Sequence, residues 1–195
     1  MKNKRSVILM VLGGLCLAAA LSLTFKNYVE EMRGERASAR AEQILRQEVI
    51  PELAEGNEAE LTVEKMQSVE IDGHEYIGVV DIPSMKLSLP VQNQWSETLL
   101  KTSPCRYSGS FMDDSMIIAG HNYKKHFNKI KYLQTGDTVT FTDVNGGIYE
   151  YAVSGIETIP GTDVKGMESG EWDLTLFTCT YGGKNRMAVR CSRTN

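Results

Sequence analysis

The chain has 195 residues, a formal net charge of −4, and 42% hydrophobic and 24% charged residues. This ordinary composition excludes wholesale disorder, and the length suits one domain with an appendage. The first 25 residues hold three basic and no acidic residues, which leaves 18 basic and 25 acidic residues, a net charge of −7, on the rest. Because that remainder is acidic and has no basic stripe, nucleic acid is excluded as an expected partner.

Residues 1–25 are predicted to anchor the chain in a cell membrane. Lys2, Lys4 and Arg5 precede twenty uncharged residues, Ser6 to Phe25, a length that matches a helix crossing about 30 Å of hydrocarbon. The basic residues in front predict a single pass with the N-terminus in the cytoplasm and the rest of the chain outside. A cleaved signal peptide is the alternative, because Ala18–Ala20 is a run of small residues. The apolar run, however, exceeds the roughly 7–15 residues usual in signal peptides.

Residues 26–70 are predicted to form an extracellular stalk and linker. Lys26 to about Val49 is rich in Glu, Arg and Ala, which is typical of a solvated helix, and its apolar positions lack the sustained heptad of a coiled coil. Pro51 is expected to end this helix. The segment from Glu52 to Glu70 contains Gly56 and many glutamates. It is expected to be a linker, with or without a short helix.

Residues 71–195 are the predicted folded domain, in which short β-prone runs alternate with turn residues. The Asn-Gly pair in Asp143–Gly147 predicts a hairpin with a type I′ turn, and His126 to Leu133 has the spacing of one short helix. Many short strands with few helices indicate a mainly β fold, a closed antiparallel or mixed barrel with a small core. The expected strands are Tyr76–Ile82, Leu87–Val91, Ser115–Ala119, Thr138–Thr142, Ile148–Ile156, Leu174–Cys179 and Met187–Ser192.

The four cysteines point to a free thiol. Cys16 lies in the anchor, which leaves Cys105, Cys179 and Cys191 outside it. Since three is an odd number, the cysteines cannot all pair within one chain. Cys105 and Cys191 are expected to be small buried hydrophobic residues, and a disulfide between them is the alternative. No spacing of cysteine and histidine suits zinc, so no structural metal is expected.

The stretch from Leu174 to Val189 carries the candidate chemistry. A β-prone run ends at Cys179, a short turn contains Gly182 and Gly183, and a second β-prone run opens near Arg186. Two strands joined this way place Cys179 and Arg186 near each other at the rim of a sheet. A thiol beside a fixed cation ionises more easily, and the thiolate is the nucleophile. The alternative is a buried, inert cysteine and a solvated arginine.

A second strand end supplies a proton donor. The apolar run Ser115–Ala119 is followed by Gly120 and His121, and histidine is the usual proton donor for the leaving group of a cysteine nucleophile. His74 and His126 do not sit at such a strand end, and a surface position is expected for both. Cys179, His121 and Arg186 therefore make a candidate acyl-transfer site.

With these residues, the sequence resembles the sortases, the membrane-anchored cysteine transpeptidases of Gram-positive bacteria. Thr175-Leu176-Phe177-Thr178-Cys179 fits the TLxTC signature of the family, and the likeness also rests on Ala119-Gly120-His121 and on Arg186 to Val189. The runs Tyr76–Pro83 and Leu87–Val91 are similar to the opening strands of the family. The resemblance covers about residues 70 to 193. It implies a closed sortase β-barrel of about seven to eight strands with short helices, behind the membrane helix and the stalk.

The resemblance also implies a mechanism. Cys179 would attack a peptide carbonyl in the C-terminal sorting signal of a surface protein and form a thioacyl-enzyme, while His121 would protonate the leaving amine. Arg186 would hold the substrate backbone or the oxyanion, where removing one donor typically costs about 10²–10³ in rate. An amine from a peptidoglycan precursor or a pilin subunit would resolve the thioester. Thr178 and Asn122 are expected to bind substrate, and no cofactor is implied.

Two connections are shorter than in the best-known sortases. Six residues separate Cys179 from Arg186, and the segment from Ile156 to Leu174, expected to read the sorting signal, is also short. Class B sortases carry a long helix in that segment, although His121-Asn122 and the run after Arg186 look closest to class B. The class, the sorting motif and the acceptor therefore stay open. Calcium binding by the acidic residues of that segment, as in some class A members, is the alternative to a set of solvated carboxylates. These acids are Glu168, Glu171 and Asp173.

The sequence leaves two other functions as alternatives. A membrane-anchored β-barrel that binds cell-wall proteins or peptides without catalysis would use the same groove, with Cys179 merely structural. A thiol-reactive reagent distinguishes the two, since a buried structural thiol does not label at neutral pH. A papain-like hydrolase needs its cysteine before its histidine, whereas His121 here precedes Cys179.

Overall fold

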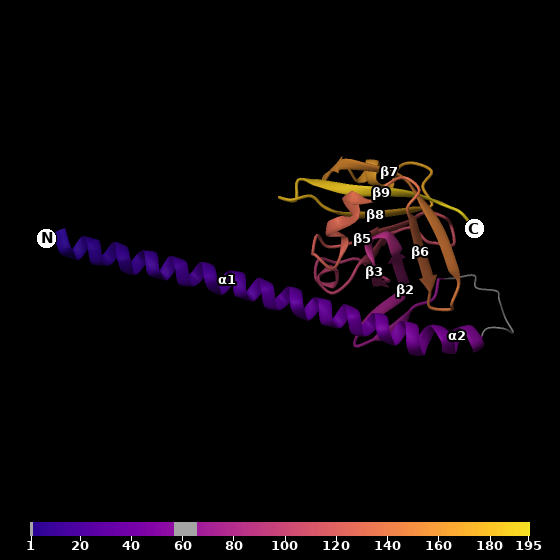
Figure 1. Ribbon diagram of the computed structural model, residues 1–195, viewed down its shortest axis with the longest axis horizontal. Helices are drawn as coiled ribbons and strands as arrows, with labels where there is room; N and C mark the ends of the chain where they lie inside the picture. The colour runs from indigo at the N-terminus through magenta and orange to yellow at the C-terminus, as the bar shows by residue number, and fades with distance from the viewer. Residues whose placement is uncertain (1, 57–65) are drawn as a thin grey trace.

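The computed structural model describes residues 2–56 and 66–195 and shows one long helix lying against a β-barrel (Figure 1). Helix α1 (Lys2–Ile44) continues through a π-helical segment, η1 (Leu45–Val49), into α2 (Ile50–Gly56). The prediction that Pro51 ends the helix is wrong. The wider π-helical segment before Pro51, in which the Ile50 amide donates to the Leu45 carbonyl, accommodates a residue without an N–H. Part of the predicted linker lies outside the described residues.

The N-terminal part of this helix is apolar enough to cross a membrane. An 18-residue window near its start has a mean hydropathy of 2.4, and none of that window is buried against the protein. In Figure 1 the N-terminal part of α1 extends well away from the barrel. This exposed apolar surface is what a lipid-facing helix presents.

Nine strands form one sheet in the order β1-β2-β3-β4-β5-β8-β9-β7-β6, and a further pairing of β6 with β2 closes eight of them into a barrel. The barrel is mixed, because β3 with β4 and β5 with β8 are parallel while the other pairs are antiparallel. All seven predicted strands are present, and β1 and β4 are additional. The strands are β1 (Val69–Ile71), β2 (His74–Ile82), β3 (Leu87–Gln92), β4 (Cys105–Ser108), β5 (Met116–Ala119), β6 (Thr138–Asp143), β7 (Ile148–Pro160), β8 (Leu174–Cys179) and β9 (Asn185–Arg193).

Short helical segments connect these strands. They are η2 (Pro83–Met85), η3 (Leu99–Lys101), η4 (Phe127–Tyr132) and α3 (Val164–Glu168). The 3₁₀ helix η4 confirms the short helix expected at His126 to Leu133, whereas α3 lies in a segment for which only a loop was predicted. The barrel interior is filled by alternate aliphatic and aromatic side chains such as Ile77, Met116, Phe141 and Leu176, all fully buried.

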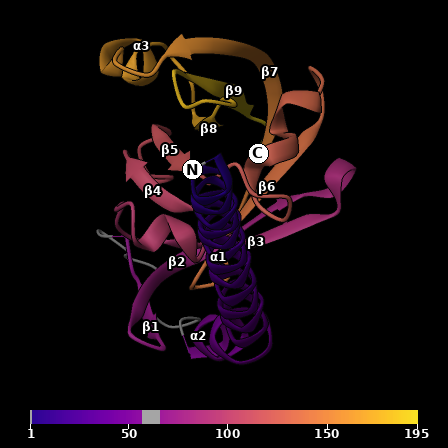
Figure 2. The ribbon, with the colours of Figure 1, turned by 90° about the vertical axis from the view of Figure 1, so that its left-hand side faces the viewer.

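The C-terminal part of the helix packs on the barrel and is not a solvated stalk. Ala41 and Leu45 are buried against Ile71, Tyr76 and Val144, in a second apolar cluster on the outside of the sheet. Figure 2, seen from the N-terminal side, shows α1 crossing beside β2 and β3. The pattern missed this packing because two buried positions on a charged helix do not make a periodic stripe.

Polar contacts also hold the part of the helix from Glu30 to Arg46 against the barrel. The Glu30 carboxylate pairs with Lys101 at 3.3 Å and the Glu35 carboxylate with Lys125 at 2.8 Å. Farther along, Arg46 donates to Asp81 at 2.5 Å and to the Ser88 hydroxyl at 2.9 Å. The first two contacts join the helix to η3 and to the segment that follows β5.

The β6–β7 hairpin forms as predicted, but not with a type I′ turn. A type I′ turn requires a positive φ at both of its central residues, here Asn145 and Gly146. Gly146 has a φ of 86°, but Asn145 does not have a positive φ. Instead, the Asp143 carboxylate accepts hydrogen bonds from the Asn145 and Gly147 amides, each at 2.8 Å, and these bonds hold the turn. A side chain that holds the backbone of its own turn is the reason the turn takes another form.

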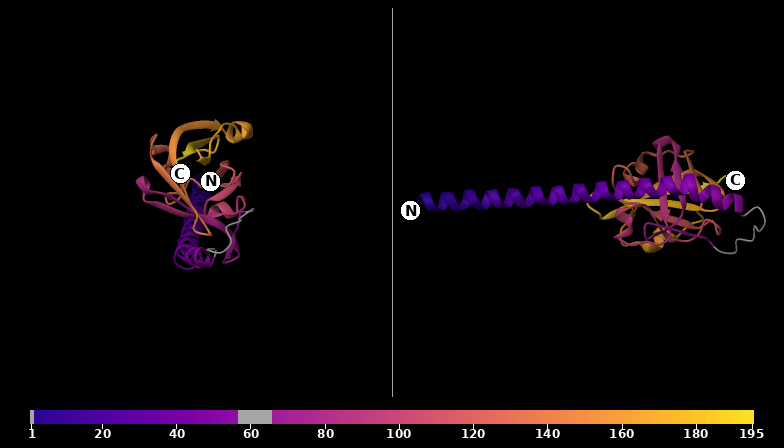
Figure 3. Two further views of the ribbon diagram at one scale, coloured as in Figure 1. Left: turned by 90° about the vertical axis from the view of Figure 1, so that its right-hand side faces the viewer. Right: turned by 90° about the horizontal axis from the view of Figure 1, so that it is seen from below.

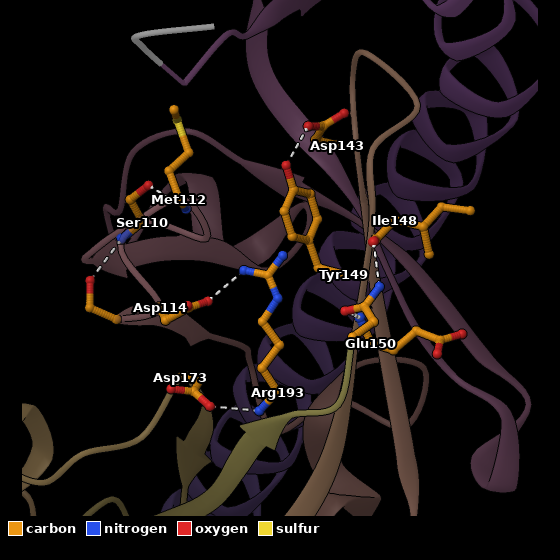
Figure 4. Close-up of polar contacts among 11 residues, drawn as sticks. Ser110, Met112, Asp114, Asp143, Ile148, Tyr149, Glu150, Asp173 and Arg193 are labelled. Carbon is orange, nitrogen blue, oxygen red and sulfur yellow. Dashed lines mark hydrogen bonds and ion pairs between the residues drawn. The ribbon is translucent and has the colours of Figure 1, made fainter. Parts of the chain in front are cut away.

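Arg193, near the C-terminal end of β9, joins several elements at one end of the barrel (Figure 4). Arg193 pairs with Asp114 at 2.7 Å, its guanidinium lies over the Tyr149 ring at 4.9 Å, and its backbone N–H donates to the Asp173 carboxylate at 2.6 Å. The Tyr149 hydroxyl donates in turn to Asp143 at 3.1 Å. This network connects β9 to the segment before β5 and to the β6–β7 hairpin.

Candidate active site

Three neighbouring strands bring the predicted catalytic residues to one rim. In the parallel β5–β8 pair, Ala119 lies opposite Phe177, and the Gly120 amide donates to the Phe177 carbonyl at 2.9 Å. His121 and Cys179 each follow that matched pair by two residues, so both side chains emerge at the same end of the sheet. Arg186 lies opposite Cys179 in the antiparallel β8–β9 pair. We call this end of the barrel the cleft rim.

His121, Cys179 and Arg186 all line a single cleft of about 180 Å³. Its walls are largely apolar, with Leu100, Tyr107, Met167 and Phe177 among the lining residues, and it carries the carboxylates of Glu97 and Asp163. Cys179 is half-buried and its thiol is free. The arrangement therefore offers a thiol, an imidazole and a guanidinium to one bound group, which is what acyl transfer through a thioester needs.

The imidazole of His121 is held in a partly desolvated position. Its ring stacks on Tyr123 with centroids 4.0 Å apart and planes 11° apart. Burial lowers the pKa of His121, although the Glu97 carboxylate acts in the opposite direction. A histidine whose pKa lies below its ordinary value is neutral near pH 7, and can take a proton from a thiol before giving it to a leaving amine.

Arg186 is oriented by the turn that precedes it. Its Nη1 donates to the Gly183 carbonyl at 2.9 Å and to the Asn185 carbonyl at 3.3 Å. Gly182 has φ of 84°, which suits the third position of the β-turn closed by the bond from the Gly183 amide to the Thr180 carbonyl. With one nitrogen fixed on the turn, the planar guanidinium keeps other N–H groups for the cleft.

Thr178 and Asn122 are not among the residues that line the cleft. Thr178 precedes Cys179 on β8, and its side chain is therefore on the other face of the sheet, where it is buried. Asn122 follows His121 and is half-buried. A contact with substrate stays a prediction for both residues.

The other two histidines lie away from the cleft lining. His126 is only 1% exposed, so the predicted surface position is wrong. It lies under the segment that carries His121, with its ring 5.6 Å from that of Tyr123, and burial lowers its pKa to about 4. His74 is partly exposed, and its Nδ1 lies 3.2 Å from the Gln92 side-chain oxygen.

One wall of the cleft depends on a residue that sequence reasoning missed. Asp163, Val164 and Met167 belong to α3 or its N-cap and line the cleft. Arg190 of β9, 3% exposed, donates to the Gly166 carbonyl at 2.7 Å and to the Met167 carbonyl at 2.8 Å. It also donates to Glu157 at 2.6 Å and to Thr175 at 2.9 Å. The available signal was a single arginine inside the apolar β9 run, since buried charges are almost always paired.

The structure bears on two alternatives, calcium binding by the acidic segment and a disulfide between Cys105 and Cys191. Within residues 2–56 and 66–195, no group of three or more histidine, cysteine or acidic side chains is placed to hold a metal. Asp173 of the acidic segment is engaged by the Arg193 backbone instead. Cys105 and Cys191 are free and fully buried in different apolar clusters. Burial raises the pKa of each of these two thiols to about 12, so both are poor nucleophiles.

Comparison with known proteins agrees with this geometry. A family model described as Sortase domain matches residues 80–194. Sortase A from Bacillus anthracis is 31% identical over 121 residues, which span 59% of this chain and 57% of that relative. The structure is similar to sortase C1 from Streptococcus agalactiae, with a TM-score of 0.60, 26% identity, and coverage of 83% of this chain and 99% of the other.

A further solved structure, a sortase D5 transpeptidase from Clostridium perfringens, shares the fold with a TM-score of 0.58 at 20% identity, covering 82% of this chain and 97% of that one. These similar proteins are named as classes A, C and D, and the motif likeness to class B stays a prediction. The family match covers more than half of the chain, and it includes the strands that carry His121, Cys179 and Arg186. The chain therefore belongs to the sortase family.

Proposed function

We propose that this protein is a membrane-anchored cysteine transpeptidase that uses Cys179, His121 and Arg186. The observation that carries the proposal is that three adjacent strand ends present these side chains to one cleft. In a scaffold that only binds peptides, there would be no reason for a thiol, an imidazole and a guanidinium to share one apolar cleft. This favours catalysis over the non-catalytic alternative.

The reaction follows from the chemistry of the three groups. Cys179 Sγ attacks a peptide carbonyl while neutral His121 takes the thiol proton, and the guanidinium of Arg186 stabilises the oxyanion. The C–N bond breaks as His121 returns that proton to the leaving amine, which leaves a thioester on Cys179. A second amine attacks the thioester, loses a proton to His121, and forms a new amide as the thiol is regenerated.

The partners proposed are those that the family resemblance implies. The donor is a surface protein with a C-terminal sorting signal, and the acceptor is an amine of a peptidoglycan precursor or a pilin subunit. The uncharged run Ser6 to Phe25 anchors the protein in the cell membrane with its N-terminus in the cytoplasm and the domain of residues 71–195 outside. Intact-mass analysis of membrane-extracted protein checks the anchor, because a mature chain that begins just after Ala20 would mean a cleaved signal peptide.

A peptide library offered to the full chain, with hydroxylamine as the acceptor, tests the function. The proposal expects cleavage of a defined peptide set and formation of a hydroxamate at the new C-terminus. Cys179→Ala should cleave no peptide. Its matched control, Cys105→Ala, removes a buried thiol outside the cleft and should still cleave. A chain that binds library peptides without cleaving any of them would support the non-catalytic alternative.

A further inference from the structure

The cleft rim of the barrel is the rim that faces the N-terminal end of α1. Figure 1 shows the segment between β8 and β9 extending toward that end of the helix, and the view from below in Figure 3 shows the same projection. The C-terminus and the Arg193 network lie at the other end of the barrel. The ion pairs agree, since Glu30 and Glu35 of α1 contact Lys101 and Lys125 near the cleft, whereas Arg46 reaches Asp81 farther along.

The helix leaves little distance between this rim and the apolar run. The run ends at Phe25, and Glu30 already contacts the barrel through Lys101. At 1.5 Å per residue, these five residues span about 7.5 Å. The headgroup layer on each side of a bilayer is roughly 5–8 Å thick. A barrel held at that height touches the headgroup layer unless the helix bends.

The residues at the junction have the chemistry of a membrane interface. Lys26 and Tyr28 directly follow the apolar run, and the Tyr28 side chain is 59% exposed. Tyrosine and lysine at this position are typical anchors at the boundary between lipid and water. They place the interface at residues 26–28, immediately before the first contact with the barrel.

The β8–β9 turn offers a matching side chain on the barrel itself. Tyr181 is 100% exposed at the turn, beside the exposed Lys184. The turn is closed by bonds from the Gly183 amide to the Thr180 carbonyl at 2.9 Å and from the Thr180 amide to the Asn185 carbonyl at 2.9 Å. Tyr181 is therefore presented by a hydrogen-bonded turn two residues from Cys179. A single exposed tyrosine is ordinary, but one on the rim nearest the lipid is positioned to enter the headgroup layer.

We infer that the cleft rim docks on the outer interface of the membrane, with Tyr181 in the headgroup layer and the tether from Phe25 to Glu30 setting the height. The occupant of this surface is the lipid of the bilayer that holds α1. The inference rests on the anchor of the proposed function. It adds that the cleft opens beside the bilayer and not toward the distant cell wall.

Quenching by brominated lipids measures the depth of the turn. The full chain is reconstituted in vesicles of phosphatidylcholine and phosphatidylglycerol that are brominated near the interface, and Tyr181→Trp is compared with Ile148→Trp. Ile148 is the matched control, because it is 57% exposed and lies at the opposite rim of the barrel. The unsubstituted chain is measured as well, so that the fluorescence of Trp95 and Trp172 can be subtracted. We expect quenching of Tyr181→Trp to exceed that of Ile148→Trp several-fold.

An insertion tests whether the tether sets the height. Seven helix-forming residues placed between Val29 and Glu30 lift the barrel by about 10 Å and turn it by only about 20°. Quenching of Tyr181→Trp is then expected to fall to the level of Ile148→Trp, while cleavage of soluble peptides persists. Equal quenching of the two uninserted variants, or quenching that survives the insertion, would overturn the inference.

Two further outcomes can be told apart from these. If Tyr181→Trp is shielded from aqueous acrylamide but not quenched by lipid, protein such as a second copy covers the turn, which would also overturn the docking. A chain that fails to float with the vesicles would overturn the anchor, and with it this inference. The peptide-cleavage test of the transpeptidase is independent of both results.

Discussion

Cys179 and Arg186 lie directly opposite each other in the β8–β9 pair. Residues opposite each other on antiparallel strands have Cβ atoms about 4.5–5.5 Å apart and point to the same face. Both line the cleft, and the Arg186 guanidinium is fixed by the Gly183 carbonyl at 2.9 Å. A cation held in this way can act on the thiol, on a bound substrate, or on both. These roles predict different behaviour for a variant of Arg186.

Arg186→Lys separates the two roles. Lysine keeps the charge but lacks the planar fork that holds two acceptors. If Arg186 clamps the substrate or the oxyanion, kcat/KM falls on the order of 10²-fold or more, while the pH profile of Cys179 alkylation by iodoacetamide barely moves. Peptide turnover and iodoacetamide labelling are measured on the same preparations. Near-normal turnover would contradict the clamp, and a large shift of the labelling profile would favour a role in thiol ionisation.

Arg190→Lys tests the support of the cleft wall. Lysine cannot reproduce the donors that reach both the Gly166 and Met167 carbonyls. Losing one such charged hydrogen bond costs about 1.5–3 kcal/mol, which corresponds to about tenfold or more in KM if α3 binds substrate. We expect KM to rise with kcat near normal and with unchanged alkylation of Cys179. A fall in kcat at constant KM would show that Arg190 does not act through substrate binding.

His126→Phe probes the buried imidazole beneath the His121 segment. Burial holds the pKa of His126 at about 4, below the ordinary value of about 6.5. Between these two values the unfolded chain binds a proton that the folded chain excludes, so stability falls as pH falls from about 6.5 to 4. The loss is about 3 kcal/mol. Urea unfolding at pH 7 and pH 4 should therefore show a smaller loss for His126→Phe than for the wild type, and equal losses would contradict a buried neutral imidazole.

Leu45→Ala tests whether the helix is part of the folded domain. Leu45 is fully buried in the cluster with Tyr76 and Val144, and removing such a side chain typically costs about 2–5 kcal/mol. Urea unfolding of a chain that begins at Lys26 measures the loss, with Glu48→Ala at an exposed position of the same helix as the control. If both variants unfold at the same urea concentration, η1 does not contribute to the stability of the barrel.

The strands were predictable and the supports of the site were not. The runs Ser115–Ala119 and Leu174–Cys179 are short, largely apolar and contain β-branched residues, so the local pattern places Cys179 at a strand end and His121 just beyond one. That those ends meet depends on the parallel β5–β8 pairing, which no local signal specifies. The family resemblance implied only a closed barrel and a shared site for the three residues. The cleft wall depends on Arg190 and α3, which are far apart in the sequence. Similarly, the burial of Leu45 and His126 arises from the packing of η1 and the His121 segment on the barrel.

The most direct test of the central claim is the intact mass of the protein during turnover of a cleaved peptide. If Cys179 is the nucleophile, rapid acid quench should show the chain plus the acyl fragment of the peptide, located by fragmentation on Cys179. This adduct should be absent in Cys179→Ala and should disappear when hydroxylamine is added. Cys179→Ala should keep the unfolding curve of the wild type and lose all cleavage. Cleavage that persists in Cys179→Ala, or an acyl adduct on another residue, would contradict the account.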